Sequence, residues 1–406
     1  MRHGMFRRTA LAIGAGALLG LGVAPAVPAV ADNTAAPADD PFYLPPSPLP
    51  AGTPGDIVRS RPAKFAVNAA VTSTQVLYQT QNATGNTVAV SGTVLVPTKA
   101  WAGTGPRPLV SYAVGTRGIG DSCAPSKTLA QGVDYEQFHI NDLLNKGWAV
   151  AVTDMEGLGT PGVHPYIVGQ SAGRAVLDMA RAAQRLPGTG LNASTPVGVV
   201  GYSQGGSSAG WAAELAPTYA PDLNLKGVSA GGIPADPLAM RTFLEGGPFT
   251  GLMLMAALGF DSAYPDLKLD SYLNETGKRI KERYQSVCLV SFDLGPVLFD
   301  TAFRRINDFT TRSPLDDPAW QAKFNLNKLG STRPAVPVFQ SHARFDEVVG
   351  FDQGNTLRND WCKAGTNLTW KTYIVAEHLI GFLRNWPDAT AFLNDRFQNK
   401  PVTGNC

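Results

Sequence analysis

The segment 197–206 contains the residues best suited to covalent chemistry. It reads Val-Gly-Val-Val-Gly-Tyr-Ser-Gln-Gly-Gly, a strand-like apolar run that leads directly into Gly-x-Ser-x-Gly around Ser203. In this motif the chain turns sharply from strand to helix, and bulky neighbours of the serine would clash. The hydroxyl then lies at the start of a helix, where backbone N–H groups favour negative charge. The pattern predicts that Ser203 is a nucleophile.

A serine hydroxyl is a weak nucleophile at its ordinary pKa and needs a neighbouring base. Of the five histidines, His378 follows a β-like run near the C-terminus. A chain order of serine, acid and histidine would place the base there. The alternative for His378 is a core histidine satisfied by structural hydrogen bonds. His342 could line the same cleft, or simply close a strand. We therefore predict His378 as the base.

A third residue should hold the imidazole in the correct tautomer and stabilise its cation. Asp346 is the best-placed acid, because it follows the end of a predicted strand by a few residues and precedes the predicted base. Glu347 is its close competitor. Asp316 and Asp317 are weaker candidates, because they fall in a region without strand rhythm.

Acyl transfer also requires hydrogen-bond donors for the oxyanion. One donor is expected to be the N–H of Gln204, the residue after the nucleophile. The second is expected in the glycine-rich loop 114–121, at Gly115, Thr116 or Arg117. This loop departs from the dinucleotide-binding pattern Gly-x-Gly-x-x-Gly, and a cysteine follows it instead of a clear helix. An oxyanion loop is therefore the preferred interpretation.

These side chains need a scaffold that brings distant segments together. Apolar runs without alternation are separated by helix-like segments such as Ala172–Leu186, a pattern typical of a buried, mostly parallel sheet. Before them come two β-rich stretches, Phe65–Thr72 and Thr74–Pro97, which predict antiparallel N-terminal strands. The apolar runs are Pro108–Val114, Trp148–Val152, Val197–Val200 and Val336–Phe339.

Composition divides the rest of the chain. Residues 32–54 are rich in Pro and Ala and should form an extended arm. Residues 235–333 lose the strand rhythm, and an insertion of this length is better interpreted as a helical cap than as a loop. The core would then comprise residues 55–234 and 334–406. The run Leu252-Met-Leu-Met255 fits a buried helix and an acyl-chain tunnel equally well.

Residues 1–31 have the pattern of a secretory signal, with arginines at the front, a short apolar run and an Ala-Val-Ala cleavage site. We expect a secreted protein with no transmembrane segment, since no apolar run is long enough to span a bilayer. The 34 basic and 32 acidic residues form no polyanion-binding patch, which argues against a nucleic-acid partner.

The cysteine content agrees with an oxidising compartment. Four cysteines could form two bridges in any of three connectivities. No Cys-x-x-Cys pair occurs, so neither zinc nor dithiol redox chemistry is expected. The cysteines are Cys123, Cys288, Cys362 and Cys406.

Four sequence motifs together resemble the secretory lipase family of α/β-hydrolases, and the similarity extends over roughly Pro45–Cys406. The motifs are Cys123-Ala-Pro-Ser126, Gly201-Tyr-Ser-Gln-Gly205, Gly246-Gly-Pro-Phe-Thr-Gly251 and Ala376-Glu-His-Leu379. The resemblance implies the α/β-hydrolase fold, with a mostly parallel central sheet, antiparallel N-terminal strands and an inserted helical cap. It also implies action on carboxylic esters without a metal or organic cofactor.

The resemblance implies particular residues as well. Ser203, Asp346 and His378 would form the catalytic triad. The implied disulfides are Cys123–Cys288 and Cys362–Cys406. A yeast member of the family uses an acidic side chain before its Cys-Ala-Pro-Ser motif to build the oxyanion hole. This chain has a glycine-rich segment there instead, so we expect a backbone donor.

The expected function is therefore that of a secreted serine carboxylic ester hydrolase, a lipase or esterase that forms a covalent acyl-enzyme. Its partner would be a small-molecule or lipid ester, with a lipid–water interface as a further partner. One alternative on the same triad is a short-chain, polyester or deacetylating esterase, and another is an acyltransferase. A non-catalytic binding protein on a hydrolase scaffold is the different-class alternative, and the complete triad argues against it.

Overall fold

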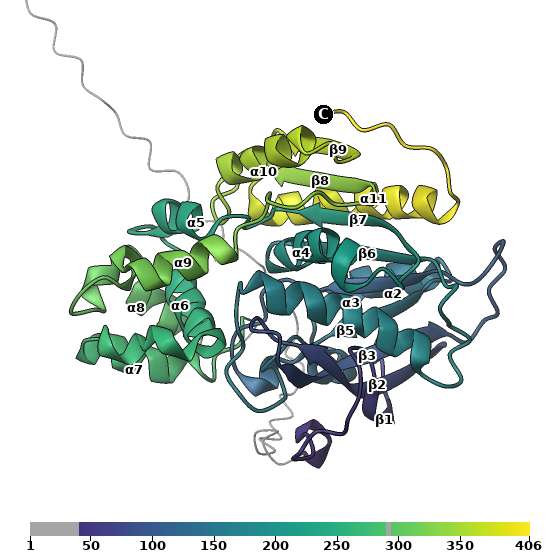
Figure 1. Ribbon diagram of the computed structural model, residues 1–406, viewed down its shortest axis with the longest axis horizontal. Helices are drawn as coiled ribbons and strands as arrows, with labels where there is room; N and C mark the ends of the chain where they lie inside the picture. Colours follow the sequence, from purple (N-terminus) through teal and green to yellow (C-terminus); the bar gives the residue numbers. More distant parts are fainter. Residues whose placement is uncertain (1–39, 290–293) are drawn as a thin grey trace, which may run out of the picture. The chain divides into compact units, whose positions relative to one another are not determined.

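The computed structural model describes residues 40–289 and 294–406; the predicted signal segment and the first part of the predicted arm lie outside these residues. A nine-stranded sheet runs in the order β1-β2-β3-β5-β4-β6-β7-β8-β9 (Figure 1). The strands are β1 (Ile57–Ala63), β2 (Val71–Gln81), β3 (Thr87–Pro97), β4 (Leu109–Ala113), β5 (Ala149–Thr153), β6 (Val197–Tyr202), β7 (Leu225–Gly231), β8 (Val338–Ala343) and β9 (Leu368–Tyr373).

The sheet has two parts. The pairs β1–β2, β2–β3 and β3–β5 are antiparallel, whereas every pair from β5 through β4 to β9 is parallel. Every residue of β4, β5 and β6 is buried. Burial on both faces explains why these strands are continuous apolar runs in the sequence. The predicted mostly parallel sheet with antiparallel N-terminal strands is confirmed.

One predicted strand is wrong. Residues 65–70 of the expected strand Phe65–Thr72 lie in turns and irregular structure, and the first strand, β1, lies earlier in the chain. Strand β1 contains Arg59, Arg61 and Pro62 and is at most half-buried. It pairs only with β2, at the edge of the sheet, where polar side chains and proline are tolerated. An edge strand of this kind has no apolar signature in the sequence.

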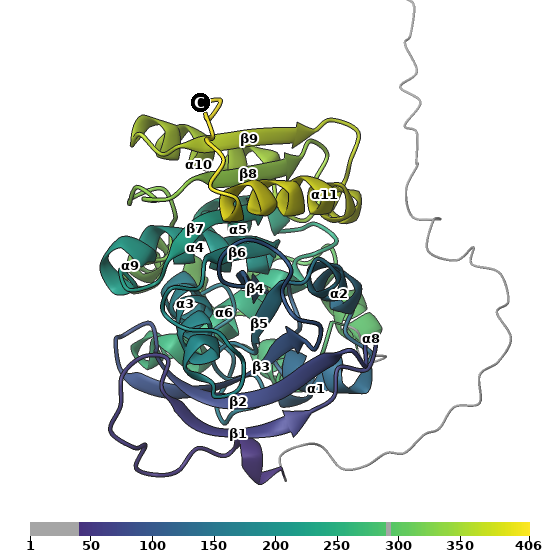
Figure 2. The same ribbon diagram turned by 90° about the vertical axis from the view of Figure 1, so that its right-hand side faces the viewer.

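Helices cover both faces of the sheet. The pair α3–α4 packs together with α10 on one face, and α2 and α11 lie on the other (Figure 2). Because β4, β6 and β8 are parallel, their carboxyl ends lie at one edge of this layer, where open α/β sheets bind ligands. The helices are α1 (Pro125–Gln131), α2 (Gln137–Asn145), α3 (Gly169–Arg185), α4 (Gln204–Tyr219), α10 (Phe351–Lys363) and α11 (His378–Phe397).

Between β7 and β8 the described residues form five further helices, on the left of Figure 1, and we call this part of the chain the helical insertion. They share an apolar core of their own, which includes Phe260, Tyr284 and Trp320. None of the helices in the described part of the chain has the length and apolarity needed to cross a bilayer. The helices of the insertion are α5 (Pro237–Leu244), α6 (Gly251–Ala263), α7 (Glu275–Tyr284), α8 (Leu294–Thr301) and α9 (Pro318–Leu326).

The termini of the described chain are fastened to this core. Phe42 and Tyr43 form a 3-10 turn (Pro41–Tyr43) and are buried against the sheet. Two disulfides, Cys123–Cys288 and Cys362–Cys406, are present. The first ties the loop after β4 to the helical insertion, and the second ties α10 to the C-terminal residue. These are the pairings that the family resemblance implies.

Candidate active site

Ser203 occupies a sharp bend between β6 and α4. Its φ is 59° and its ψ is −124°, a positive φ that is uncommon for a residue other than glycine. A Cβ at Gly201 would lie 2.1 Å from the carbonyl oxygen of Gly205, and a Cβ at Gly205 would lie 2.1 Å from that of Ala113. Only glycine fits at both positions, so the Gly-x-Ser-x-Gly pattern has a direct steric cause.

The imidazole of His378 lies beside this bend. Its Nε2 is 3.0 Å from the Oγ of Ser203. His378 is the first residue of α11, and two side chains bond its backbone while a third caps the helix that it begins. Glu377 caps the helix, the carboxylate of Glu347 accepts the N–H of His378 at 3.0 Å, and the Tyr202 hydroxyl donates to its carbonyl oxygen at 3.1 Å. The imidazole is therefore fixed through its backbone.

Asp346 lies in the loop after β8, and its side chain is fully buried. Its Oδ2 accepts a hydrogen bond from Nδ1 of His378 at 2.7 Å. Its Oδ1 accepts the backbone N–H groups of Val348 and Val349 at 3.0 and 2.6 Å. With Nδ1 protonated, the lone pair on Nε2 faces the Ser203 hydroxyl. This arrangement can remove the serine proton and stabilise the imidazolium that results.

The competing residues make other contacts, although Nε2 of His342 lies 3.7 Å from Oδ2 of Asp346. Glu347 accepts the backbone N–H of His378, whereas the imidazole binds Asp346. Asp316 pairs with Arg241, and Asp317 caps α9. His342 is completely buried, with its Nε2 donating to the Val349 carbonyl oxygen at 2.8 Å, and burial lowers its pKa. Among the described residues, none of these four side chains forms a hydrogen bond with the Ser203 hydroxyl, which binds His378.

Gln204 has a backbone N–H at the start of α4, next to Ser203. As the first residue of α4, its N–H has no helical carbonyl to bind. Its side-chain Nε2 donates to Nε2 of His164 at 2.8 Å, and Nδ1 of His164 donates to the Glu156 carbonyl oxygen at 2.7 Å. Burial lowers the pKa of His164 to about 4. A neutral His164 can therefore accept the hydrogen bond that fixes the Gln204 side chain.

The three loop candidates for the second donor differ, and Arg117 lines neither cavity at Ser203. The N–H of Gly115 donates to the carboxylate of Glu136 at 3.1 Å, so it is not available to an oxyanion. This geometry removes Gly115 from the predicted donors. Thr116 lines the cavities beside Ser203, and its N–H has no hydrogen-bond acceptor within the described residues. Thr116 is therefore the remaining candidate that faces the serine.

The loop is held rigidly on its outer side. Arg117 is buried and forms ion pairs with Asp134 at 3.0 Å and Glu136 at 2.6 Å. Its carbonyl oxygen accepts the N–H of Leu289 at 2.7 Å, next to the Cys123–Cys288 bridge. The sequence analysis missed these clamping residues, because their positions in the chain carry no motif.

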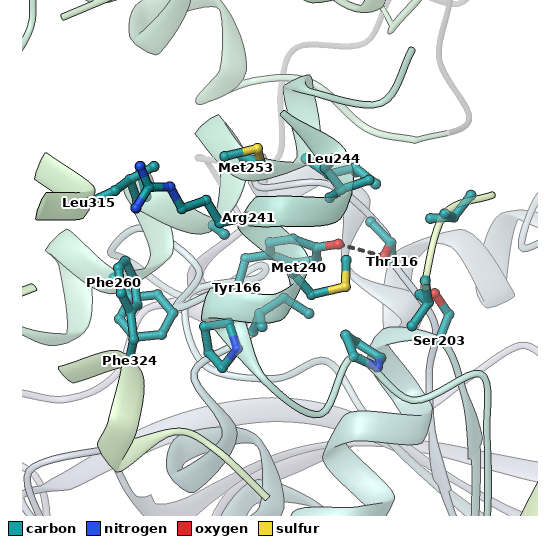
Figure 3. A pocket seen from close by; sticks show the side chains of 18 residues that line it. Thr116, Tyr166, Ser203, Met240, Arg241, Leu244, Met253, Phe260, Leu315 and Phe324 are labelled. Atoms are coloured by element: carbon teal, nitrogen blue, oxygen red, sulfur yellow. Dashed lines mark hydrogen bonds between the residues drawn. The ribbon is translucent and has the colours of Figure 1, made fainter. Parts of the chain in front are cut away.

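Two apolar cavities meet at Ser203, and both also include Thr116. The α6 cavity extends into the helical insertion (Figure 3). The α11 cavity includes His378 and lies between the insertion and the start of α11. Residues that line only the α6 cavity of the two include Met240, Met253, Ala256, Phe260 and Phe324. Residues characteristic of the α11 cavity are Tyr135, Tyr202, Phe249, Leu379 and Phe382.

Comparisons with known sequences agree on one family. The family model described as secretory lipase matches residues 123–405. Probable inactive lipase MT1628 of Mycobacterium tuberculosis is 32% identical over 384 residues, which cover 90% of this chain and 84% of the relative. Secreted triacylglycerol lipase LIP7 of Malassezia globosa is 31% identical over 391 residues, covering 91% of this chain and 81% of the relative.

Solved structures support the same assignment. Candida antarctica lipase A superposes with a TM-score of 0.81 at 28% identity, covering 90% of this chain and 87% of that chain. The rice cell wall degrading esterase LipA from Xanthomonas oryzae, at 19% identity and a TM-score of 0.67, covers 86% and 98% of the two chains and shows the fold alone. The chain therefore belongs to the secretory lipase family and is a secreted, triacylglycerol-lipase-like carboxylic ester hydrolase with the α/β-hydrolase fold.

Proposed function

We propose that this chain hydrolyses lipid esters through a covalent acyl-enzyme, with Ser203 as nucleophile, His378 as base and Asp346 as acid. The observation that carries the proposal is the continuous hydrogen-bonded chain of the three side chains, at 3.0 and 2.7 Å. One relative is named a probable inactive lipase. In this chain all three groups are present and hydrogen-bonded, which supports activity.

In the first half of the reaction, the Ser203 oxygen forms a bond to the ester carbonyl carbon while its proton passes to Nε2 of His378. The carbonyl π electrons move to oxygen, which the N–H groups of Gln204 and Thr116 stabilise. The intermediate then collapses and expels the alcohol, which takes the proton from His378. In the second half, water attacks the acyl-enzyme by the same proton transfers and frees the acid.

The two cavities suggest how an ester is oriented. The leaving alcohol must receive its proton from His378, so it should occupy the α11 cavity, which includes that imidazole. The acyl chain would then enter the α6 cavity, and the helical insertion would act as the cap of the enzyme. Their apolar linings favour long hydrocarbon chains on either side of the ester.

Exposed apolar side chains near the mouth support a lipid–water interface as the place of action. Leu379 lines the α11 cavity and is still 62% exposed, and Leu383 one turn further along α11 is 51% exposed. Phe138 of α2 is 68% exposed, and its neighbour His139 stacks on Trp386 of α11. Clustered exposed apolar groups mark surfaces that contact lipid or protein.

Hydrolysis of esters that differ only in acyl length tests this function. We expect residues 1–31 to act as the export signal. The purified protein should hydrolyse emulsified triacylglycerols. Ser203→Ala should reduce turnover by about 10⁶-fold. Release of free acid without a matching ester product, in the presence of an added alcohol, would support hydrolysis over acyl transfer. A folded protein that cleaves no ester of any acyl length would contradict the proposal.

A further inference from the structure

Thr116 holds a distinctive position in the site. It and Ser203 line both cavities, so the two residues face the point at which an ester carbonyl must lie. Figure 3 shows Thr116 between Tyr166 and Ser203, with a hydrogen bond to the tyrosine. Thr116 is only 8% exposed. A polar side chain that is buried in an apolar cavity needs a hydrogen-bond partner.

The contacts of the surrounding loop fix which groups can face the serine. The N–H of Gly115 donates to Glu136 at 3.1 Å, and the carbonyl oxygen of Thr116 accepts the Tyr135 hydroxyl at 3.0 Å. The carbonyl oxygen of Arg117 accepts a backbone N–H of the insertion. These bonds use the Gly115 N–H and two carbonyl oxygens of the loop. The N–H and the hydroxyl of Thr116 are therefore left for the cavities that this residue lines.

Tyr166 determines how the hydroxyl of Thr116 can be used. The two hydroxyl oxygens are 3.0 Å apart. Tyr166 is buried, and its backbone packs so closely on α6 that a Cβ at Gly259 would lie 2.3 Å from its nitrogen. Burial raises the pKa of Tyr166 to about 12, so the phenol keeps its proton at neutral pH. When Tyr166 donates to Thr116 Oγ1, the proton of Thr116 is free to point into the cavity.

We propose that the hydroxyl of Thr116 is a third oxyanion donor, alongside the N–H groups of Gln204 and Thr116, and that Tyr166 is a positioning residue that polarises it. This inference rests on the proposed function of Ser203. When the Ser203 oxygen bonds to the carbonyl carbon, the π pair moves onto the carbonyl oxygen. Thr116 donates a hydrogen bond to that charge, and no proton leaves either hydroxyl. The chain Tyr166–Thr116–oxyanion strengthens as the charge grows.

Isosteric substitution separates the hydroxyl from the backbone donor. Thr116→Val keeps the N–H and the shape of the side chain, and should lower kcat by about 10²-fold with KM changed by less than about threefold. Thr116→Ser should restore most of the loss. Tyr166→Phe should lower kcat by about tenfold in the wild-type background and have little further effect in Thr116→Val, because the two residues act in series.

A transition-state mimic supplies a readout that a merely structural role would not move. An alkyl trifluoromethyl ketone forms a tetrahedral adduct with the serine and places a charged oxygen in the oxyanion hole. Its inhibition constant should rise in Thr116→Val by the same factor as kcat falls, while substrate KM stays constant. Tyr264→Phe is the matched control, since Tyr264 is a buried tyrosine of the insertion that accepts from Asn327 at 2.9 Å and lines neither cavity.

Two outcomes would overturn the inference. One is a Thr116→Val enzyme with unchanged kcat and unchanged inhibitor affinity. The other is an independent, fully additive loss in the double variant with Tyr166→Phe. Failure of the proposed function would look different, because the wild-type protein would then not react with a fluorophosphonate. Stoichiometric labelling of each variant also shows that the variant is folded and retains its nucleophile.

Discussion

The carboxyl end of the sheet and the helical insertion position their side chains by different means. At the sheet end, backbone contacts leave no freedom, since a Cβ at Gly205 would lie 2.1 Å from the Ala113 carbonyl oxygen, and the His378 imidazole is fixed between two oxygens at 2.7 and 3.0 Å. In the insertion, α6 lines its cavity with aliphatic and thioether side chains such as Leu252 and Met253. Such contacts have no required direction and adapt to change.

This contrast predicts that the sheet end sets the reaction rate and that the insertion selects the substrate. Groups that react need directed bonds within a few tenths of an ångström, so a small change at the sheet end should affect the rate of every ester alike. Groups that select the substrate act through volume, so a change in the insertion should affect esters according to their length. Substitutions in the two regions should therefore alter different kinetic quantities.

Among the changes that compare the two regions, the largest effect is expected from the acid at the sheet end. Asp346→Asn should lower kcat by about 10⁴-fold for short and long esters alike, because an amide cannot stabilise the imidazolium of His378 and favours the wrong tautomer. Glu347→Gln keeps an oxygen that can accept the N–H of His378, and should cost less than about tenfold. Steady-state kinetics of both variants gives the comparison, and the reverse ranking would assign the acid to Glu347.

A smaller and selective effect is expected in the insertion. Ala256 lines the α6 cavity, and Ala256→Phe should shorten the longest acyl chain that is hydrolysed while leaving kcat/KM for a short ester within about threefold. An acyl-length profile measures this shift. Ala319→Phe, at an exposed position on α9 of the same insertion, is the control. An equal loss of kcat/KM for esters of every acyl length in Ala256→Phe would contradict the proposed difference between the two regions.

The smallest effect on turnover is expected from Glu214, a buried carboxyl of α4 that lies away from the site. It accepts from Trp361 Nε1 at 2.8 Å and from the Gly330 N–H at 2.6 Å. Burial raises its pKa to about 7. Because the unfolded group ionises near pH 4.5 and the folded group near 7, the free energy of unfolding should fall as pH rises between these values, by on the order of 3 kcal/mol.

Glu214→Gln keeps the accepting oxygen and removes this titration. Denaturant unfolding at about pH 5 and about pH 7.5 should therefore show a smaller decrease in the variant than in the wild-type protein, with kcat unchanged in both. An equal decrease in the two proteins would show that Glu214 does not cause it.

The sequence predicts those parts of the molecule in which local chemistry dictates the backbone. The glycines around Ser203, the buried runs that become β4, β5 and β6, and the acid and histidine after later strands all follow such rules. Strand β1 was missed because an edge strand needs no apolar face. Gly115 was wrongly predicted as a donor because its N–H binds Glu136, which is more than twenty residues away in the chain.

The oxyanion loop shows why part of the site could not be predicted. Tyr166 reaches Thr116 from a loop fifty residues further along the chain, and no motif joins the two. Its position depends on the close approach of Gly259 in the insertion, a tertiary contact. Propensity and periodicity report on local structure, so they carry no information about such contacts.

The most direct test of the central claim is to locate the covalent adduct of a fluorophosphonate. We predict that one equivalent of probe binds per chain, that mass spectrometry of the digested protein places it on Ser203, and that His378→Ala slows the reaction by orders of magnitude while the protein remains folded. An adduct on another residue, or a labelling rate that does not depend on His378, would contradict the account.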